Sequence, residues 1–239
     1  MIETLFIADL HLQNTRPSQL TTFLKFLSER VPKAEALYIL GDLFEVWVGD
    51  DDVSYQPILT ALHNLTSSGI PVFILPGNRD FLLSEGFIAN TGCQLLADPT
   101  VIHLYGVPTL LMHGDTLCTK DTAYQKFRQQ VRTLQWQQQF LAQPLAQRYQ
   151  LAQQAREHSQ TYTQTLTDEL ADVAMEAVIA EMTNYDVRHL IHGHTHKPTL
   201  QQLTIAGQTG WRWVLGAWDD QGGMMLRCSA KSWQLVHCC

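Results

Sequence analysis

The sequence predicts an α/β fold, and three observations support this prediction. First, five short apolar runs have the length and composition of buried strands. Second, apolar residues recur at helical spacing between the early runs, as in Leu20, Phe23, Leu24 and Leu27. Third, each run stops directly at a cluster of Asp, His, Asn or Gly, which is where ligands bind in folds of alternating strands and helices. The five runs are Leu5–Ala8, Ala36–Leu40, Val72–Leu75, Thr109–Met112 and Leu190–Ile191.

The middle of the chain interrupts this strand series. Apolar residues such as Tyr124, Phe127 and Val131 recur there at helical spacing, and Pro144 should break or kink the helix. We therefore predict an inserted helical lid that covers the active site; the alternative is a polar helical hairpin that only packs on the domain. The predicted core comprises residues 1–120 and 182–239, and the predicted lid comprises residues 121–181.

The C-terminal part contains two further strand-like runs, Trp211–Leu215 and Met224–Arg227, joined by a stretch that contains glycine. They predict an antiparallel end to the sheet. The five cysteines include no C-x-x-C pair, so we expect reduced thiols rather than a disulfide framework. Cys238 and Cys239 are expected to lie in a frayed tail.

Charge is unevenly distributed along the chain. The formal net charge of −7 argues against a nucleic-acid partner. The segment from Thr116 to Arg156 nevertheless holds six basic residues against a single acid, Asp121, for a net charge of +5. Such a segment indicates an anionic ligand or an anionic membrane surface, unless it is an ordinary solvated helix face.

The N-terminus, from Met1 to Leu5, lacks the basic region and the long apolar stretch of a signal peptide. No run in the sequence approaches the ~18 apolar residues that a membrane helix needs. We therefore expect a soluble or peripheral protein rather than one that spans a membrane.

The five polar clusters supply carboxylate, imidazole and amide side chains at the predicted strand ends. That mixture suits divalent metals such as Mn, Fe, Co or Zn, and the absence of thiolates argues against a structural zinc site. Asp9 and His11 stand two residues apart, so in extended backbone both side chains leave the same face, and His194 and His196 repeat this spacing. The clusters are Asp9-Leu10-His11, Gly41-Asp42, Gly77-Asn78-Arg79-Asp80, His113-Gly114-Asp115 and His192-Gly193-His194-Thr195-His196.

Each cluster alone is weak evidence. A lone buried His more often belongs to a core, and a Gly-Asp pair after a strand is more often a turn or a helix cap. Gly41 and Gly77 precede candidate ligands at tight turns, where a small residue lets the backbone pass close to a metal or a phosphate. Five clusters in this order, each closing a strand, favour a metal centre over a purely structural role.

This ordered set resembles that of the calcineurin-like metallophosphoesterases. The resemblance implies a four-layer αββα sandwich with two divalent metal ions, for which we expect Mn²⁺, ~3.5–4 Å apart. It also implies that Asp42 bridges the two metals and that His192 contacts a ligand rather than a metal. By motif, Asp9, His11, Asp42 and His196 would hold one metal, and Asp42, Asn78, His113 and His194 would hold the other.

Arg79 departs from the common family pattern, in which a histidine follows the Gly-Asn pair. An arginine does not give up its proton, but it can hold phosphate oxygens in a fork. We therefore predict that Arg79 is a catalytic residue and that the leaving group is already a good one, such as a phosphate in a diphosphate.

Further strings narrow the resemblance. They include Leu43-Phe44-Glu45, Trp47, Gly49-Asp50-Asp51-Asp52, Asp80-Phe81-Leu82-Leu83, Asp115-Thr116-Leu117-Cys118 and Val214-Leu215-Gly216-Ala217-Trp218. These strings are similar to those of the UDP-2,3-diacylglucosamine diphosphatases of lipid A biosynthesis. The resemblance implies that a metal-bound hydroxide attacks phosphorus in UDP-2,3-diacylglucosamine, giving UMP and 2,3-diacylglucosamine 1-phosphate.

The same resemblance extends to substrate contacts. It assigns them to Asn78, Arg79, Asp121, Ser159 and His194. Thr163 stands where an asparagine is common in this family, and Leu166 stands where a lysine is common. These two replacements bear on the contacts to the sugar lipid and leave the metal chemistry untouched.

The implied partners are a lipid-linked UDP-sugar substrate and the anionic inner membrane of a bacterium, on whose cytoplasmic face the protein would lie. No nucleic acid and no obligate protein partner is expected. Two alternatives stay open: a phosphodiesterase of the same family that acts on a soluble nucleotide, and a non-catalytic scaffold that keeps the fold but not the metals.

The insertion would shelter the acyl chains or form an ordinary helix core, through Tyr124, Phe127, Trp136, Phe140 and Leu141.

Overall fold

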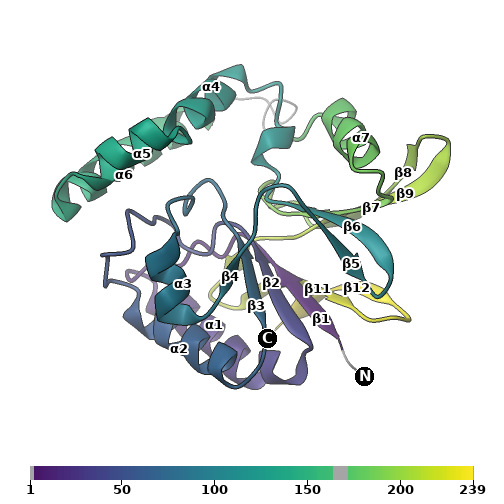
Figure 1. The fold of residues 1–239 in the computed structure, drawn as a ribbon, viewed down its shortest axis with the longest axis horizontal. Coiled ribbons are helices and arrows are strands. Elements are labelled where there is room, and N and C mark those ends of the chain that lie inside the picture. The colour runs from purple at the N-terminus through teal and green to yellow at the C-terminus, as the bar shows by residue number, and fades with distance from the viewer. Residues whose placement is uncertain (1–2, 164–171, 239) are drawn as a thin grey trace.

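The computed structural model describes residues 3–163 and 172–238, which form two β-sheets that face each other (Figure 1). In this part of the chain the first sheet has the strand order β10-β11-β1-β2-β3-β4, with β12 paired to β11. The central strands β1, β2 and β3 are parallel, and β11 runs antiparallel to β1. The strands are β1 (Thr4–Ile7), β2 (Ala36–Leu40), β3 (Val72–Leu75), β4 (Gln94–Leu95), β10 (Trp218–Asp219), β11 (Gly222–Cys228) and β12 (Trp233–Cys238).

The second sheet has the strand order β5-β6-β7-β9-β8. Its three central strands, β6, β7 and β9, are parallel, while the edge strands β5 and β8 are antiparallel to their neighbours. The strands are β5 (Thr100–Leu104), β6 (Val107–Met112), β7 (His189–His192), β8 (Thr199–Ile205) and β9 (Gln208–Val214).

Helices cover the outer faces of both sheets, and a further group lies across the edge where the strands end (Figure 1). Helices α1 (Pro17–Glu29), α2 (Gln56–Ser67) and α3 (Glu85–Thr91) lie on the first sheet, and α7 (Met175–Asn184) lies on the second. The group at the edge comprises α4 (Thr122–Val131), α5 (Leu134–Leu141) and α6 (Leu145–Thr163). Pro144 immediately precedes α6, so the predicted helix break is confirmed. Two short 3₁₀ helices, η1 (Val31–Lys33) and η2 (Asp115–Leu117), complete the helical elements of the described residues.

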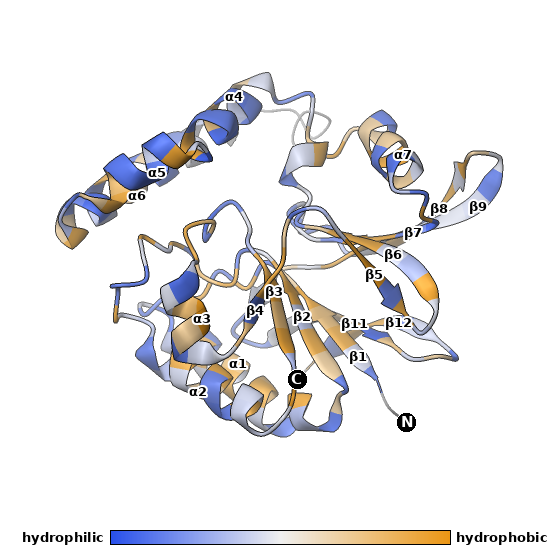
Figure 2. Ribbon diagram, in the orientation of Figure 1, coloured by the Kyte–Doolittle hydropathy of each residue, from blue (hydrophilic) through white to orange (hydrophobic). Residues whose placement is uncertain are grey.

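Three separate apolar cores define the four layers. Because side chains alternate along a strand, Leu5 and Ile7 of β1 pack against Phe23 of α1, whereas Phe6 turns into the space between the sheets. The third core joins the second sheet to α7 through residues such as Val178. Strands β2 and β3 are accordingly hydrophobic along most of their length, whereas the edge of the second sheet at β8 and β9 carries hydrophilic residues (Figure 2). Each such aliphatic or aromatic side chain contributes about 1.5–3 kcal/mol on burial, and the predicted αββα sandwich is confirmed.

The five predicted strands all form, and the predicted C-terminal end of each lies within one residue of the observed C-terminal end. The prediction that both C-terminal runs form an antiparallel end to the sheet is confirmed for the second run, which forms β11 antiparallel to β1, and is wrong for the first. The run at Trp211–Leu215 forms β9, which pairs parallel to β7 in the second sheet, whereas the run at Met224–Arg227 forms β11 in the first sheet. The hydrophobic pattern of a strand shows that its faces are buried, but it does not show which of two facing sheets the strand joins.

The C-terminal strand corrects one expectation about the cysteines. Strand β12 continues to Cys238, whose buried thiol donates to the carbonyl of Gly223 at 3.2 Å. Cys238 is therefore part of the sheet rather than of a frayed tail, while Cys239 lies outside the described residues. Cys93, Cys118 and Cys228 are buried thiols outside any disulfide, in agreement with the prediction of reduced cysteines. Among the described helices, none is both long and apolar enough to cross a membrane.

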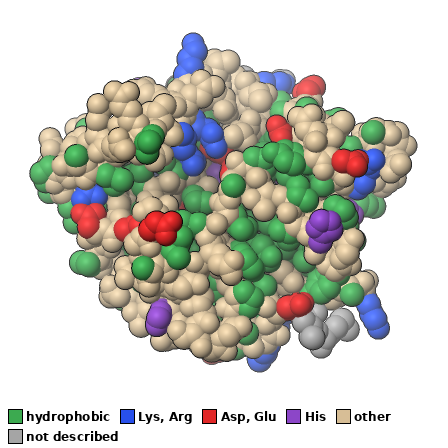
Figure 3. Space-filling model, viewed as in Figure 1, with side chains coloured by type: hydrophobic (Ala, Val, Ile, Leu, Met, Phe, Trp, Pro, Cys, Tyr) green, Lys and Arg blue, Asp and Glu red, His purple; other side chains and the backbone are tan. Residues whose placement is uncertain are grey.

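Most of the basic side chains between Thr116 and Arg156 point into the molecule. Figure 3 shows basic side chains gathered between the edge helices and the core. Arg128 Nε lies 2.7 Å from Asp115 Oδ2, Arg132 Nη2 lies 2.9 Å from the Gly77 carbonyl, Arg148 Nη1 lies 2.6 Å from the Val48 carbonyl, and Arg156 Nε lies 2.9 Å from Glu45 Oε1. For these four arginines the expectation of an outward basic surface is wrong, because the core offers carboxylates and carbonyl groups that need cationic donors.

The outer surface of the edge helices carries apolar side chains instead. Phe127, Leu134, Leu141 and Leu151 are between 40% and 70% exposed. In contrast, Phe140 is 6% exposed and stacks on Trp136, with ring centroids 4.9 Å apart. Of the residues expected to line an acyl-chain cleft or a helix core, Phe140 therefore belongs to a core, whereas Phe127 and Leu141 stay partly exposed, with Leu141 next to Gly49.

Candidate metal centre

The strands β1, β2, β3, β6 and β7 end at one edge of the sandwich, and a polar cluster follows each of them. The first three strands are parallel within one sheet, and the last two are parallel within the other. The carboxyl ends of parallel strands meet at one edge, and the two sheets bring their edges together here. The seven residues predicted to hold metal consequently converge: Asp9, His11, Asp42, Asn78, His113, His194 and His196.

One group gathers around the end of β1. His11 Nε2 lies 3.2 Å from His196 Nε2 and 3.7 Å from Asp42 Oδ2. His196 Nε2 lies 3.6 Å from Asp9 Oδ1. The potential ligand atoms of Asp9, His11 and His196 all lie within 4.8 Å of one another, so a single ion can contact all three.

A second group gathers around Asn78. Its Oδ1 atom lies 2.9 Å from His113 Nε2 and 3.1 Å from His194 Nδ1. Asp42 Oδ1 lies 3.8 Å from His113 Nε2, while the other oxygen of Asp42 faces His11 of the first group. This placement suits a bridging role for Asp42. Asp9 also lies within 4.8 Å of Asp42 and His113, so two carboxylates stand between the groups.

The backbone at the ligand residues is not an extended strand in which side chains alternate between two faces. The expectation that Asp9 and His11 share a face of extended backbone is wrong, because both have left-handed conformations beyond the end of β1. Non-glycine residues adopt such conformations rarely, and they concentrate at functional sites where the surroundings enforce them. The positive φ angles are 55° at Asp9, 49° at His11, 54° at Asp42, 69° at His194 and 57° at His196.

Two glycines make room for the ligands. Gly41 has a φ of 90°, and a Cβ atom there would lie 2.3 Å from His113 Nδ1. A Cβ atom at Gly77 would lie 2.2 Å from Asp42 Oδ1. Both positions therefore require glycine, because ligand side chains pass directly over the backbone. The sequence predicted small residues here, at tight turns where the backbone is approached closely.

The chemistry of the convergent atoms fits divalent cations. Asp9 Oδ1 is enclosed and accepts no hydrogen bond from the described residues. His113 Nδ1 lies 2.9 Å from the Leu40 carbonyl and can only donate to it, so Nε2, which faces Asn78 Oδ1, is the nitrogen that a metal would bind in place of a proton. Burial alone would lower the pKa of His113, but the carboxylates of Asp42, Asp115 and Asp9 raise it to about 9. The centre thus attracts positive charge, and its oxygen and nitrogen donors suit borderline-hard metals.

His192 is held away from this centre. Its Nδ1 lies 2.8 Å from the Gly193 carbonyl, and its Nε2 accepts a hydrogen bond from Arg212 Nε at 2.8 Å. Burial and the neighbouring guanidinium of Arg212 lower the pKa of His192 to about 3. A neutral imidazole with both nitrogens engaged has no lone pair to offer a metal, so His192 supports the loop that carries His194.

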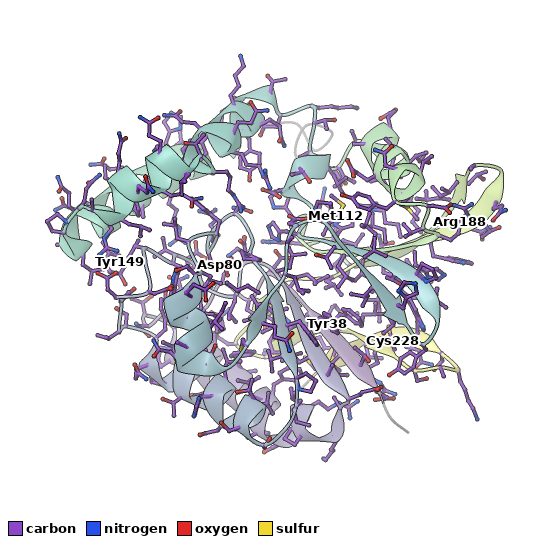
Figure 4. All side chains as sticks on the ribbon, viewed as in Figure 1. Tyr38, Asp80, Met112, Tyr149, Arg188 and Cys228 are labelled. Atoms are coloured by element: carbon purple, nitrogen blue, oxygen red, sulfur yellow. The ribbon has the colours of Figure 1, made fainter. Side chains whose placement is uncertain are left out.

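Arg79 and Asp80 have separate tasks. The backbone N–H of Arg79 donates to Asp42 Oδ1 at 2.8 Å, while its Nε is enclosed and has no hydrogen-bond partner among the described residues. Asp80 lies at the end of β3 (Figure 4) and accepts from the backbone N–H groups of Leu43, at 2.7 Å, and Gly77, also at 2.7 Å. Asp80 therefore ties together the loops that carry Asp42 and Asn78, and it does not occupy the Arg79 guanidinium.

The predicted substrate contacts lie partly at the centre and partly on the edge helices. Asn78, Arg79 and His194 belong to the centre. Asp121 caps α4, where its Oδ1 accepts from Tyr124 N at 2.9 Å and from Tyr162 of α6 at 3.1 Å. Ser159 lies in α6 and is half-buried, Thr163 is the last residue of α6, and Leu166 lies outside the described residues.

Two supporting residues stand inside motifs that the sequence revealed, yet no role was predicted for them. Asp115 is fully buried and accepts from Tyr124 Oη at 2.6 Å and from Arg128 Nε at 2.7 Å, which fixes α4 beside the centre. Glu45 is 8% exposed, and its Oε2 lies 3.2 Å from His11 Nδ1. The sequence signal that could have found both is an acid next to apolar residues within or close to a metal motif, as in Leu43-Phe44-Glu45.

Comparisons with known proteins agree with this geometry. Residues 2–198 match the calcineurin-like phosphoesterase family. The chain is 49% identical to a UDP-2,3-diacylglucosamine hydrolase of Xanthomonas campestris, over 93% of this chain and 94% of that protein. It is 48% identical to the Stenotrophomonas maltophilia protein of that name, over 97% of each chain, and 44% identical to the Klebsiella pneumoniae one, over 98% of each. A dimetal phosphatase structure from Danio rerio shares the fold, with a TM-score of 0.50 and 13% identity over 99% of this chain and 98% of that chain.

The position of Asp42 between the two groups gives a prediction about metal content. Asp42→Asn should retain less metal than His196→Ala, because Asp42 faces a histidine of each group whereas His196 belongs to only one. Mass spectrometry of the purified, folded variants gives the number of ions per chain. Equal metal contents in the two variants would show that Asp42 serves one group alone.

Proposed function

This chain belongs to the calcineurin-like phosphoesterase family, and we propose that it hydrolyses the diphosphate bond of UDP-2,3-diacylglucosamine to give UMP and 2,3-diacylglucosamine 1-phosphate. The observation that carries this proposal is the near full-length similarity, at 44–50% identity, to proteins named UDP-2,3-diacylglucosamine hydrolase. The complete set of metal-binding side chains supports an active hydrolase over a scaffold, because a scaffold is free to lose them.

Metallophosphoesterases use divalent metal ions, and the described residues include candidate ligands for them. We propose two ions, with Mn²⁺ as the expected metal. Asp9, His11, Asp42 and His196 would hold one, and Asp42, Asn78, His113 and His194 would hold the other. When bound, such ions supply Lewis-acid charge and lower the pKa of a coordinated water.

The side chains of this protein would divide the remaining work. Arg79 donates its backbone N–H to Asp42, and its enclosed Nε has no hydrogen-bond partner among the described residues. Its guanidinium would hold phosphoryl oxygens as the water oxygen bonds to phosphorus and the anhydride P–O bond breaks. The leaving group is a phosphate that departs as an anion, so the step needs no proton from residue 79, in agreement with an arginine there. Asn78, Asp121, Ser159 and His194 would contribute further substrate contacts.

The edge helices would form the cover of the site. We propose that residues 121–181 are an insertion into a core of residues 1–120 and 182–239. Its helices α4, α5 and α6 would shield the reaction from water and shelter the acyl chains, whereas its last residues belong to α7, which packs on the second sheet. Tyr124 supports this placement, because its ring lies 6.2 Å from the ring of His194 between centroids. The apolar content of the insertion favours a lipid substrate over a soluble nucleotide.

A turnover assay tests the proposed function. With added Mn²⁺ the protein should release UMP from UDP-2,3-diacylglucosamine, and a chelator should stop the release. The same UDP-sugar without acyl chains should react much more slowly, because it gains no binding energy from the insertion. Faster cleavage of a water-soluble nucleotide diester than of the lipid substrate would favour the soluble-nucleotide alternative.

Arg79 provides a sharper test of the chemistry. Arg79→Ala should lower kcat by about a hundredfold, the usual cost of one preorganised donor, and Arg79→Lys should not restore it, because lysine lacks the planar fork. Both variants keep the backbone N–H that holds Asp42, so their metal content and melting temperature should stay close to wild type. A normal kcat in fully metallated Arg79→Ala would rule out this role.

We also propose that the protein associates peripherally with the cytoplasmic face of a bacterial inner membrane. Four arginines of the basic segment are engaged inside the molecule, so the association would rest on the exposed apolar side chains of α4, α5 and α6. Leu134→Asp should reduce co-sedimentation with anionic vesicles, whereas Leu200→Asp, an exposed position on β8, should not. Wild-type protein that stays in the supernatant at low salt would contradict this proposal.

A further inference from the structure

The imidazole of His11 is contacted on both of its nitrogens. Its Nε2 points into the metal centre, 3.7 Å from Asp42 Oδ2 and 3.2 Å from His196 Nε2. Its Nδ1 lies on the other side of the ring, 3.2 Å from Glu45 Oε2, in an ion-pair contact that lacks the geometry of a hydrogen bond. The ring therefore lies between the centre and the Glu45 carboxylate.

Glu45 is held in this position from two sides. Its backbone N–H donates to the Leu12 carbonyl at 3.1 Å, which ties the loop after β2 to the loop after β1. Its second carboxylate oxygen, Oε1, lies 2.9 Å from Arg156 Nε. Arg156 comes from α6, so one continuous path of contacts leads from the edge helices through Glu45 to His11.

We propose that Glu45 and Arg156 are positioning residues for His11 and that the insertion thereby sets the metal affinity of the centre. This inference rests on the proposed metal-dependent function. A carboxylate beside Nδ1 of a histidine favours the tautomer that carries its proton there and leaves the lone pair on Nε2, and it orients the ring as a better ligand. Arg156 pairs with the outer oxygen of Glu45 and keeps the inner one directed at His11.

The inference predicts a graded loss of metal affinity. Glu45→Gln should weaken Mn²⁺ binding about 10- to 100-fold, the usual effect of removing such a supporting carboxylate. Arg156→Gln should weaken it less, and Arg156→Lys should recover part of the loss because it keeps the charge. The double variant Glu45→Gln/Arg156→Gln should be no weaker than Glu45→Gln alone, because Arg156 acts through Glu45.

Mn²⁺ affinity is measured on the metal-stripped protein by electron paramagnetic resonance or calorimetry, with no substrate present. Arg148→Gln is the matched control: Arg148 is also an arginine of α6, and it pairs with Asp51, an exposed acid of the loop after β2. Its loss should lower the melting temperature but leave Mn²⁺ affinity unchanged. Circular dichroism verifies that each variant is folded.

The outcomes separate this inference from the function on which it rests. Wild-type protein that binds no Mn²⁺ would overturn both. Wild-type binding with unchanged affinity in folded Glu45→Gln and Arg156→Gln would overturn the inference alone. An Arg156→Gln variant with a raised KM and unchanged Mn²⁺ affinity would likewise overturn it, because Arg156 would then contact the substrate rather than support His11.

Discussion

The concentration of buried negative charge at the strand ends is the constraint on which the rest of the structure depends. Four carboxylates with at most 2% exposure share this edge: Asp9, Asp42, Asp80 and Asp115. Buried like charges repel, and each loses the solvation of water. Backbone N–H groups compensate Asp80, and Tyr124 and Arg128 compensate Asp115. Asp9 and Asp42 keep oxygen atoms that face histidines. A bound cation would balance the negative charge of these two carboxylates.

The same constraint explains how the edge helices are attached. Their arginines reach the core at Asp115, at the Gly77 carbonyl, at the loop after Val48 and at Glu45. Each contact brings positive charge or a strong donor to a point where the core has an excess of acceptors. The helices are therefore attached by these polar contacts and also by apolar side chains, among them Trp136, Phe140 and Leu145, that join the core of the first sheet.

The αββα sandwich was implied by the family resemblance. The sequence patterns themselves were sufficient to predict an α/β fold, the five ligand-bearing strand ends and the convergence of Asp9, Asp42, His113 and their partners. These features follow from short-range patterns, because an apolar run and the polar cluster after it are neighbours in the chain. The inward direction of the arginines could not be predicted, since a helical periodicity does not reveal what stands opposite a long flexible side chain. Two further features depend on tertiary contacts and could not be predicted either. They are the left-handed backbone at Asp9 and His11 and the division of β9 and β11 between the two sheets.

The distribution of the ligands along the chain has a consequence for the order of events during synthesis. His11 and His196 face each other although they are 185 residues apart, and the backbone of Asp9 is held by Trp218, later still in the chain. A ribosome that adds about 5–20 residues per second needs roughly 10–40 s to span that separation. Throughout that interval the early ligands exist without their partners, so the emerging polypeptide cannot form the centre. The choice of metal is therefore made by the completed fold and by the ions available to it on release.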